Sequence, residues 1–341
     1  MVDLSPPRHG GDLAAAIARF GGRADDWIDC STGIAPEPYP LPAIPAAIWQ
    51  RLPDSDADLL RAAGDYYGCD QLLALPGSQA AIGGLPRLRA RCRVGIVGPT
   101  YAEHGWQWQQ HGHQVVQLAP AQVDAALAQL DVLIVVNPDN PTGRQLPAAR
   151  LLDWCRQLAP RGGWLIVDEA FADATPQHSL LPQIGQAGLM VLRSVGKFFG
   201  LAGMRLGFIA AEPAVRNALQ WQLGPWPVSS VAQWAGTLAL ADREWQQQQR
   251  QRLHEASHWL QATLPDAGLP LAGALPLLHW CPTPQALQWH RALARQRIWC
   301  RYFDQPQALR FGPVAAMQQT EFRRRLLAAA DLMTTEHRIQ Q

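Results

Sequence analysis

A single lysine is the residue with the clearest chemical meaning in this sequence of 341 residues. The chain has 29 Lys and Arg residues, and Lys197 is the one that is not arginine, which indicates a task that arginine cannot perform. An amine can lose its proton and attack an aldehyde to form an imine, whereas a guanidinium stays charged. Lys197 follows a short apolar segment expected to be a buried strand, and Arg205 follows in the same motif. Burial and a nearby cation both favour the neutral, nucleophilic amine.

A carboxylate ends a second apolar segment. Residues 164–167 read Trp-Leu-Ile-Val, which is typical of a buried strand, and Asp168 follows them. Open α/β sheets bind ligands at the carboxyl ends of their strands. A carboxylate there can keep a pyridine nitrogen protonated, so that the charged ring accepts electrons from a breaking bond. An aspartate at a strand end is also a common helix cap or metal ligand, and Lys197 favours the first role.

An asparagine lies in a proline-rich turn after a third apolar segment. Residues 131–136 are predicted to form a strand, and residues 137–143 read Asn-Pro-Asp-Asn-Pro-Thr-Gly. Two prolines hold such a turn, and Asn140 can present an amide donor to a phenolate oxygen. The tetrapeptide Asn-Pro-Thr-Gly at residues 140–143 could be an ordinary turn, but its position after a strand favours a binding role.

A glycine and a serine open a predicted helix at residues 75–81. The backbone N–H groups of Gly77 and Ser78 would face an anion there, although any helix start can resemble this pattern. Ser194 and Arg205 are candidates for further ligands of the same phosphate. An amine, a ring-facing carboxylate, a phenolate donor and a phosphate site together predict that the chain carries pyridoxal 5′-phosphate (PLP) on Lys197.

The apolar segments that position these residues predict an α/β fold with a mostly parallel sheet between helices. Short β-branched runs alternate with helical stretches at residues 94–97, 131–136, 164–167 and 190–192. We predict a large PLP-binding domain at residues 51–227. The small α+β domain would combine an N-terminal arm at 1–50, with a short helix near 12–19, and a C-terminal part at 228–341. The C-terminal part would contain a long helical stretch at 231–263, strands near 277–280 and 308–311, and a final helix at 319–333.

The composition excludes several other classes of protein. The formal net charge is +1, so no excess of positive charge indicates nucleic acid or an anionic membrane as a partner. No run approaches the roughly 18 apolar residues of a spanning helix, and no leader pattern opens the chain. The six cysteines form no CxxC pair or metal-ligand cluster. We therefore expect a cytoplasmic enzyme that acts on small molecules and whose cysteines are reduced.

The motifs, in this order, resemble the fold-type I PLP enzymes, and within them the histidinol-phosphate aminotransferase-like group. Residues 8–12, 31–34 and 99–104 are similar to those of the threonine-phosphate decarboxylase family of cobalamin biosynthesis. The resemblance implies decarboxylation of L-threonine O-3-phosphate to (R)-1-amino-2-propanol O-2-phosphate by a homodimer, with the active site at the domain interface.

The resemblance also implies roles for individual residues. Lys197 would form the imine and move protons, Asp168 would pair with the ring nitrogen, and Asn140 would bind the phenolic oxygen. The cofactor phosphate would contact the turn and the arginine of the lysine motif: Gly77, Ser78, Gln79, Ser194 and Arg205. The substrate would contact residues from both ends of the chain: His9, Gly10, Gly11, Gly33 and Arg310, of which Arg310 would bind the α-carboxylate.

Three positions depart from the pattern of the aminotransferases. The ring-stacking position, commonly a tyrosine, looks like His104. Phe171 stands where a tyrosine would touch the phenolic oxygen, and Leu52 where relatives often have a tyrosine that reaches the partner's cofactor. Each change removes a polar contact and puts the electronics of the site, but not cofactor binding, in question.

Other functions remain as alternatives. The nearest is an aminotransferase of histidinol phosphate or a similar phosphorylated amine, because decarboxylation and transamination differ in which bond is aligned with the ring. A non-catalytic PLP-fold regulator is disfavoured by the intact Lys197 and by the lack of a preceding helix-turn-helix pattern. A nicotinamide enzyme would need a G-x-G-x-x-G turn, which residues 95–99 do not supply.

Overall fold

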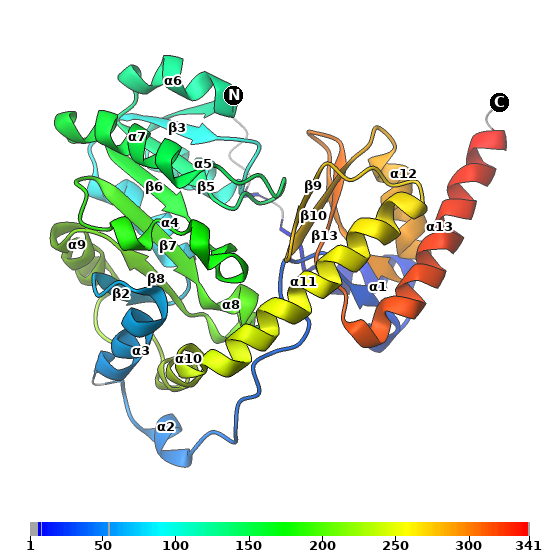
Figure 1. Ribbon diagram of the computed structural model, residues 1–341, viewed down its shortest axis with the longest axis horizontal. Coiled ribbons are helices and arrows are strands. Elements are labelled where there is room, and N and C mark those ends of the chain that lie inside the picture. The colour runs from blue at the N-terminus through cyan, green and yellow to red at the C-terminus, as the bar shows by residue number, and fades with distance from the viewer. Residues whose placement is uncertain (1–5, 8, 54, 340–341) are drawn as a thin grey trace. The chain divides into compact units, whose positions relative to one another are not determined.

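The computed structural model describes residues 6–7, 9–53 and 55–339, and these divide into two compact units (Figure 1). Unit 1 contains residues 6–7 and the described residues of 38–140 and 144–247. Unit 2 contains residues 9–37, 141–143 and 248–339. Arg8, part of the N-terminal motif, lies outside the described residues.

A seven-stranded sheet forms the centre of unit 1, in the order β2-β8-β7-β6-β5-β3-β4. Its strands are β2 (Leu72–Leu75), β3 (Arg93–Val97), β4 (Gln114–Leu118), β5 (Val132–Val136), β6 (Trp164–Asp168), β7 (Leu189–Ser194) and β8 (Gly207–Ala210). The ladders from β4 to β7 are parallel, and β8 is antiparallel to both β7 and β2. The predicted α/β fold with a mostly parallel sheet is confirmed.

This topology places the predicted cofactor residues at one edge of the sheet. The carboxyl ends of β2, β5, β6 and β7 lie at the same edge, because these strands run in one direction. The amino end of the antiparallel β8 lies there too, which brings the segment before Gly207 to the same place. Strands buried on both faces read as continuous apolar runs, and all five residues of β5 are buried.

Helices pack on the sheet of unit 1, and their apolar residues form a hydrophobic core with those of the strands. On one face, apolar residues of α4 (Gln79–Gly84), α5 (Glu103–Gln110) and α9 (Pro213–Leu223) form a cluster with Ile166 of β6 and Leu192 of β7. The other helices of the unit are α2 (Ala46–Gln50), α3 (Ala57–Tyr67), α6 (Val123–Ala126), α7 (Ala148–Leu158), α8 (Val195–Phe198) and α10 (Ser230–Ala241).

Unit 2 is an α+β unit with its own core. Its antiparallel sheet has the order β12-β13-β10-β9, formed by β9 (Gly273–Leu275), β10 (Leu278–Pro282), β12 (Arg301–Phe303) and β13 (Ala308–Phe311). A parallel pair joins β1 (Ile28–Asp29) to β11 (Ile298–Trp299). The helices are α1 (Leu13–Phe20), α12 (Ala286–Arg295), α13 (Gln319–Ile339) and most of α11 (Arg243–Asp266). Of the described helices, none has the length and apolarity needed to cross a membrane.

The division of the chain differs from the predicted boundaries at residues 50 and 227. Residues 38–50 and 228–247 belong to unit 1, where α10 packs against α3. The helical stretch predicted at 231–263 is two helices, because Asp242 ends α10. Its carboxylate accepts the backbone N–H of Trp245 at 3.0 Å, and this contact starts the next helix.

Candidate active site

A cavity opens at the edge of unit 1 where the strand ends meet. Apart from His104, the residues predicted to contact the cofactor all line it: Gly77, Ser78, Gln79, Asn140, Asp168, Ser194, Lys197 and Arg205. Tyr101, Ala170 and Phe171 also line it. The sequence motifs, which span more than a hundred residues, therefore converge on one place.

Lys197 lies on α8, the short helix that follows β7, and is half-buried. Its Nζ is 5.8 Å from the centroid of the Phe171 ring. The helix is held close to residues 202–204, because a Cβ on Gly196 would lie 2.7 Å from the Cα of Ala202. Only glycine fits at 196, so the local sequence fixes the backbone that carries the amine.

Asp168 ends β6 and is 3% exposed. Its Oδ1 accepts the backbone N–H of Ala170 at 3.0 Å, and its Oδ2 lies 2.9 Å from Nε2 of His104. A carboxylate only accepts hydrogen bonds, so Nε2 of His104 is the donor. Both oxygens of Asp168 are thus oriented by hydrogen-bond partners, and Asp168 is part of the cavity wall.

His104, the residue predicted to stack on the cofactor ring, is not among the residues that line the cavity. The His104 ring is 1% exposed and contacts Asp168, whereas Tyr101, which precedes α5 and lies three residues earlier, lines the cavity. Burial raises the pKa of the Tyr101 hydroxyl, which stays protonated and donates to Gln79 Oε1 at 3.4 Å. The amide of Gln79 in turn donates to the buried Glu103 at 2.8 Å.

Another part of the cavity lining combines a cation, hydroxyl groups and a tight turn. Gly77 has φ +79°, and a Cβ on it would lie 2.8 Å from Nη2 of Arg205. The Arg205 guanidinium therefore occupies the space that a side chain at 77 would fill. Ser78, at the start of α4, and Ser194, at the end of β7, add hydroxyl groups to the same lining.

Asn140 is carried by a closed loop after β5. The side chain of Asn137 accepts the backbone N–H of Leu146 at 2.7 Å and donates to its carbonyl at 3.2 Å. These two bonds join the ends of the loop and fix its shape. Asn140 projects to the cavity from this loop.

The residues predicted to bind the substrate lie in unit 2 and gather around Ser31. The N–H of Gly11 donates to Ser31 Oγ at 2.9 Å, and Arg310 Nη2 donates to the Ser31 carbonyl at 2.5 Å. A Cβ on Gly10 would lie 2.4 Å from that carbonyl, so the contact requires glycine. His9 is exposed and Gly33 is buried.

A second arginine lies opposite Arg310, and the motifs gave no hint of its role. Arg301 of β12 pairs in register with Arg310 of β13, and its Nη1 donates to the His9 carbonyl at 2.9 Å. Burial, and then the charge of Arg301, lower the pKa of Arg310 to about 10. Like charges directly opposite each other in a sheet are unfavourable, so an anion bound between these side chains would be stabilised. The alternation of side chains along two adjacent strands was the signal that could have revealed Arg301.

Comparisons with known proteins identify relatives of this chain. A family model described as aminotransferase class I and II matches residues 49–328. The chain is 51% identical to a threonine-phosphate decarboxylase from Pseudomonas aeruginosa over 89% of its own length and 92% of the relative's. It is 43% identical to one from a Sinorhizobium species, over 90% and 93% of the two chains.

A solved structure shows the same fold. The histidinol-phosphate aminotransferase from Sinorhizobium meliloti, in complex with pyridoxal-5′-phosphate, superimposes with a TM-score of 0.84 over 98% of both chains, at 19% identity. The matched family model and the sequence identity to curated relatives show family membership as well as a shared fold. The chain belongs to the aminotransferase class I and II family, together with these threonine-phosphate decarboxylases.

Proposed function

We propose that this enzyme decarboxylates L-threonine O-3-phosphate to (R)-1-amino-2-propanol O-2-phosphate, with PLP as its cofactor, as a step of cobalamin biosynthesis. The observation that carries the proposal is the convergence of Lys197, Asp168, Asn140 and Arg205 on one cavity in a chain that is 51% identical to a threonine-phosphate decarboxylase.

The residues of the cavity fit PLP at each of its functional groups. The Arg205 guanidinium and the hydroxyls of Ser78 and Ser194 line the cavity beside the Gly77 turn, and these groups suit a phosphate dianion. Asp168 would pair with the ring nitrogen and Asn140 with the phenolic oxygen. When bound, PLP supplies an aldehyde for an amine and a ring that accepts the electrons of the breaking bond.

The chain's own groups prepare that chemistry. Lys197 Nζ would hold the cofactor and later carry a proton to the substrate's Cα after CO₂ has left. Asp168 would present its carboxylate to the ring in a fixed orientation, because Ala170 and His104 each contact one of its oxygens. Tyr101, which lines the cavity where His104 was expected, is the group we propose to stack on the ring.

The two anionic groups of the substrate have two matching arginines. We propose that Arg310 binds the α-carboxylate and that Arg301, in register with it, binds the phosphate together with the segment 9–11. Each guanidinium offers a planar fork of donors to a carboxylate or a phosphate. The cross-strand pair would thereby select amino acids that carry a second, phosphorylated end.

The test is CO₂ release from L-threonine O-3-phosphate by the PLP-loaded enzyme. Transfer of an amino group from histidinol phosphate to 2-oxoglutarate is measured in parallel. Rapid CO₂ release without a keto acid supports the proposal, and keto-acid-dependent transfer alone would identify an aminotransferase instead. Lys197→Ala should abolish the activity and shift or abolish the visible absorbance band of bound PLP.

We also propose that the enzyme is a homodimer in the cytoplasm. Trp49, Leu52 and Trp226 are 65%, 58% and 53% exposed and border one hollow of unit 1, an apolar surface that suits a second copy of the chain. All six cysteines are free thiols, as in a reducing compartment. Leu52→Arg should shift the sedimentation coefficient to that of a monomer, whereas Trp221→Arg, at an 81% exposed position outside the hollow, should not.

A further inference from the structure

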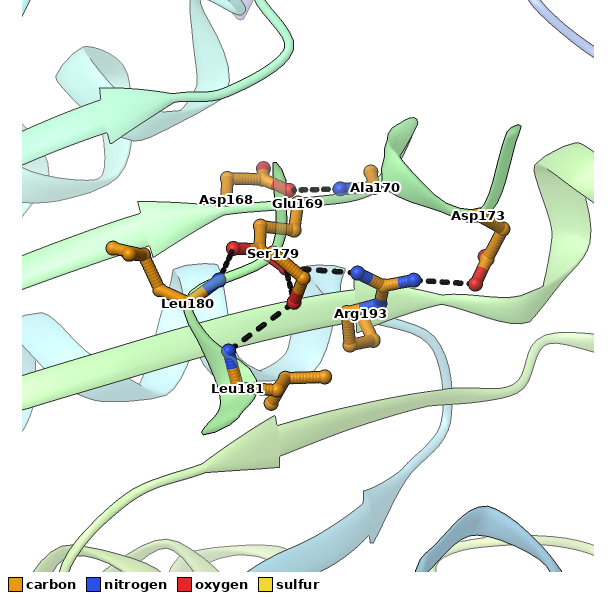
Figure 2. Close-up of polar contacts among 8 residues, drawn as sticks. All are labelled: Asp168, Glu169, Ala170, Asp173, Ser179, Leu180, Leu181 and Arg193. Carbon is orange, nitrogen blue, oxygen red and sulfur yellow. Dashed lines mark hydrogen bonds and ion pairs between the residues drawn. The ribbon is translucent and has the colours of Figure 1, made fainter. Parts of the chain in front are cut away.

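A buried ionic network lies beside Asp168 and Ala170, two residues of the cavity wall (Figure 2). Arg193, 1% exposed near the end of β7, donates from Nη1 to Glu169 Oε2 at 2.8 Å and forms a second ion pair with Asp173. Its guanidinium lies 4.7 Å from the centroid of the Tyr67 ring. Charged groups are seldom buried to this extent, and removing one partner of such a pair is strongly destabilising.

The network holds the loop that follows Asp168. Glu169 accepts the hydroxyl of Ser179 at 2.5 Å and the N–H of Leu180 at 2.7 Å, while Arg193 binds Asp173. Figure 2 shows Arg193 between Glu169 and Asp173, with Ser179 and Leu180 on the other side of Glu169. The loop between these anchors begins with two residues of the cavity wall, Ala170 and Phe171.

The same network joins the ends of two strands. Side chains alternate between the faces of a sheet, so Asp168 and Ser194 face one side and Glu169 and Arg193 the other. The Glu169 N–H donates to the Leu192 carbonyl at 2.9 Å, and the ion pair lies just beyond this last rung. Each member of the pair is therefore one residue from a group that lines the cavity.

Burial raises the pKa of Glu169, and Arg193, Ser179 and Leu180 oppose that change. For Arg193, burial alone would lower the pKa, but Asp173, Tyr67 and Glu169 together raise it well above its ordinary value. The guanidinium is thus held firmly in its charged form, with carboxylates on two sides.

We propose that Glu169 and Arg193 are positioning residues that fix the Asp168 carboxylate against the cofactor ring without touching the cofactor. The proposal rests on the PLP site argued above. The ion pair fixes the ends of β6 and β7, and the tethered loop fixes the N–H of Ala170 that orients Asp168 Oδ1. Loss of the pair would let Asp168 shift and weaken its hold on the protonated ring nitrogen.

The test is Glu169→Gln, which keeps the shape of the side chain and removes its charge. We expect PLP release from the variant to be faster by about tenfold, the lower end of the loss in affinity that follows when a group orienting a metal ligand is removed. A less protonated ring is a weaker electron sink, so the proton on the Lys197 nitrogen should be held to higher pH. The pH midpoint of the visible absorbance change of bound PLP should therefore rise.

A matched control comes from the opposite edge of the same sheet. There the Asp131 carboxylate accepts the backbone N–H of Arg93 at 2.8 Å, at the end of the strands away from the cavity. Asp131→Asn should lower the unfolding midpoint of the apoprotein and leave PLP release and the absorbance titration unchanged. The same pattern in Glu169→Gln would overturn the proposal, because a purely structural role would produce it.

A second variant guards against a failure to fold. Asp173→Asn keeps the Glu169–Arg193 pair and weakens one tether of the loop, and it should also speed PLP release. Unchanged release in this variant would equally contradict the proposal. Neither readout involves substrate turnover, so a wild-type enzyme that binds PLP but releases no CO₂ would refute the proposed reaction and leave this inference to be judged separately.

Discussion

A buried histidine of unit 2 should make the stability of the protein depend on pH. His279 in β10 is 0% exposed, and its Nε2 lies 2.9 Å from the hydroxyl of Ser257 in α11. Burial lowers its pKa from 6.5 to about 4, because the charged imidazolium would lose its hydration, and hydrogen bonds to Ser257 and Phe311 offset this only in part. The folded protein therefore contains the neutral ring.

The sign and size of the effect follow from linkage. In the unfolded chain His279 binds a proton near pH 6.5, whereas in the folded chain it does so near pH 4. Between these values the unfolded state binds more protons, so stability falls as the pH falls. At pH 5 the loss amounts to roughly 2 kcal/mol relative to pH 8.

Urea unfolding of the apoprotein, followed by circular dichroism at pH 8 and pH 5, measures this loss. The reference is His279→Gln, whose amide can replace Nε2 as the partner of Ser257 but cannot titrate. The variant should be less stable at pH 8 and lose about 2 kcal/mol less than the wild type on going to pH 5. Titration of His290, the other histidine of unit 2 with a pKa of about 4, cancels in the comparison. Equal losses in the two proteins would show that His279 is protonated in the fold and refute the reasoning.

Three further predictions concern the two binding regions. Gly77→Ala would place a methyl group 2.8 Å from Arg205 Nη2 at φ +79°, and the Kd for PLP, measured by absorbance titration, should rise by about tenfold. His104→Phe leaves Asp168 Oδ2 without its buried donor, and fluorescence titration should show PLP bound about tenfold more weakly, whereas unchanged affinity would rule out an orienting role. Arg310→Lys keeps the charge but loses the planar fork, so the KM for L-threonine O-3-phosphate should rise more than kcat falls in steady-state assays.

The parts of the fold that the sequence predicted are those with a strong local pattern. β5, β6 and β7 are buried on both faces and read as unbroken apolar runs. β4 was missed because it is an edge strand whose five residues include only one that is fully buried. The break between α10 and α11 was missed because Asp242 caps a helix there without any proline or glycine to mark it.

In the candidate site, motifs identified the residues that touch the cavity but not their neighbours. The lysine, aspartate and asparagine stand at strand ends, where chemistry is readable from position and residue type. Tyr101 and His104 are only three residues apart at the start of α5, so spacing alone could not decide which one faces the cavity. Arg301 became a candidate only when the ladder placed it opposite Arg310, because cross-strand register is not encoded in a single segment.

Side chains alternate between the two faces of a strand, and this explains why the sequence reveals the residues that face the cavity more readily than the buried residues that support them. At the end of β6, Asp168 faces the cavity, and its neighbour Glu169 faces the buried Arg193. Residue type identifies the first, because a carboxylate beside a ring nitrogen has a known chemical use. It cannot identify the second, because a buried carboxylate is tolerable only with a partner that the chain supplies 24 residues later. Glu169→Gln therefore tests whether Glu169, on the buried side of the strand end, controls the position of Asp168, on the side that faces the cavity.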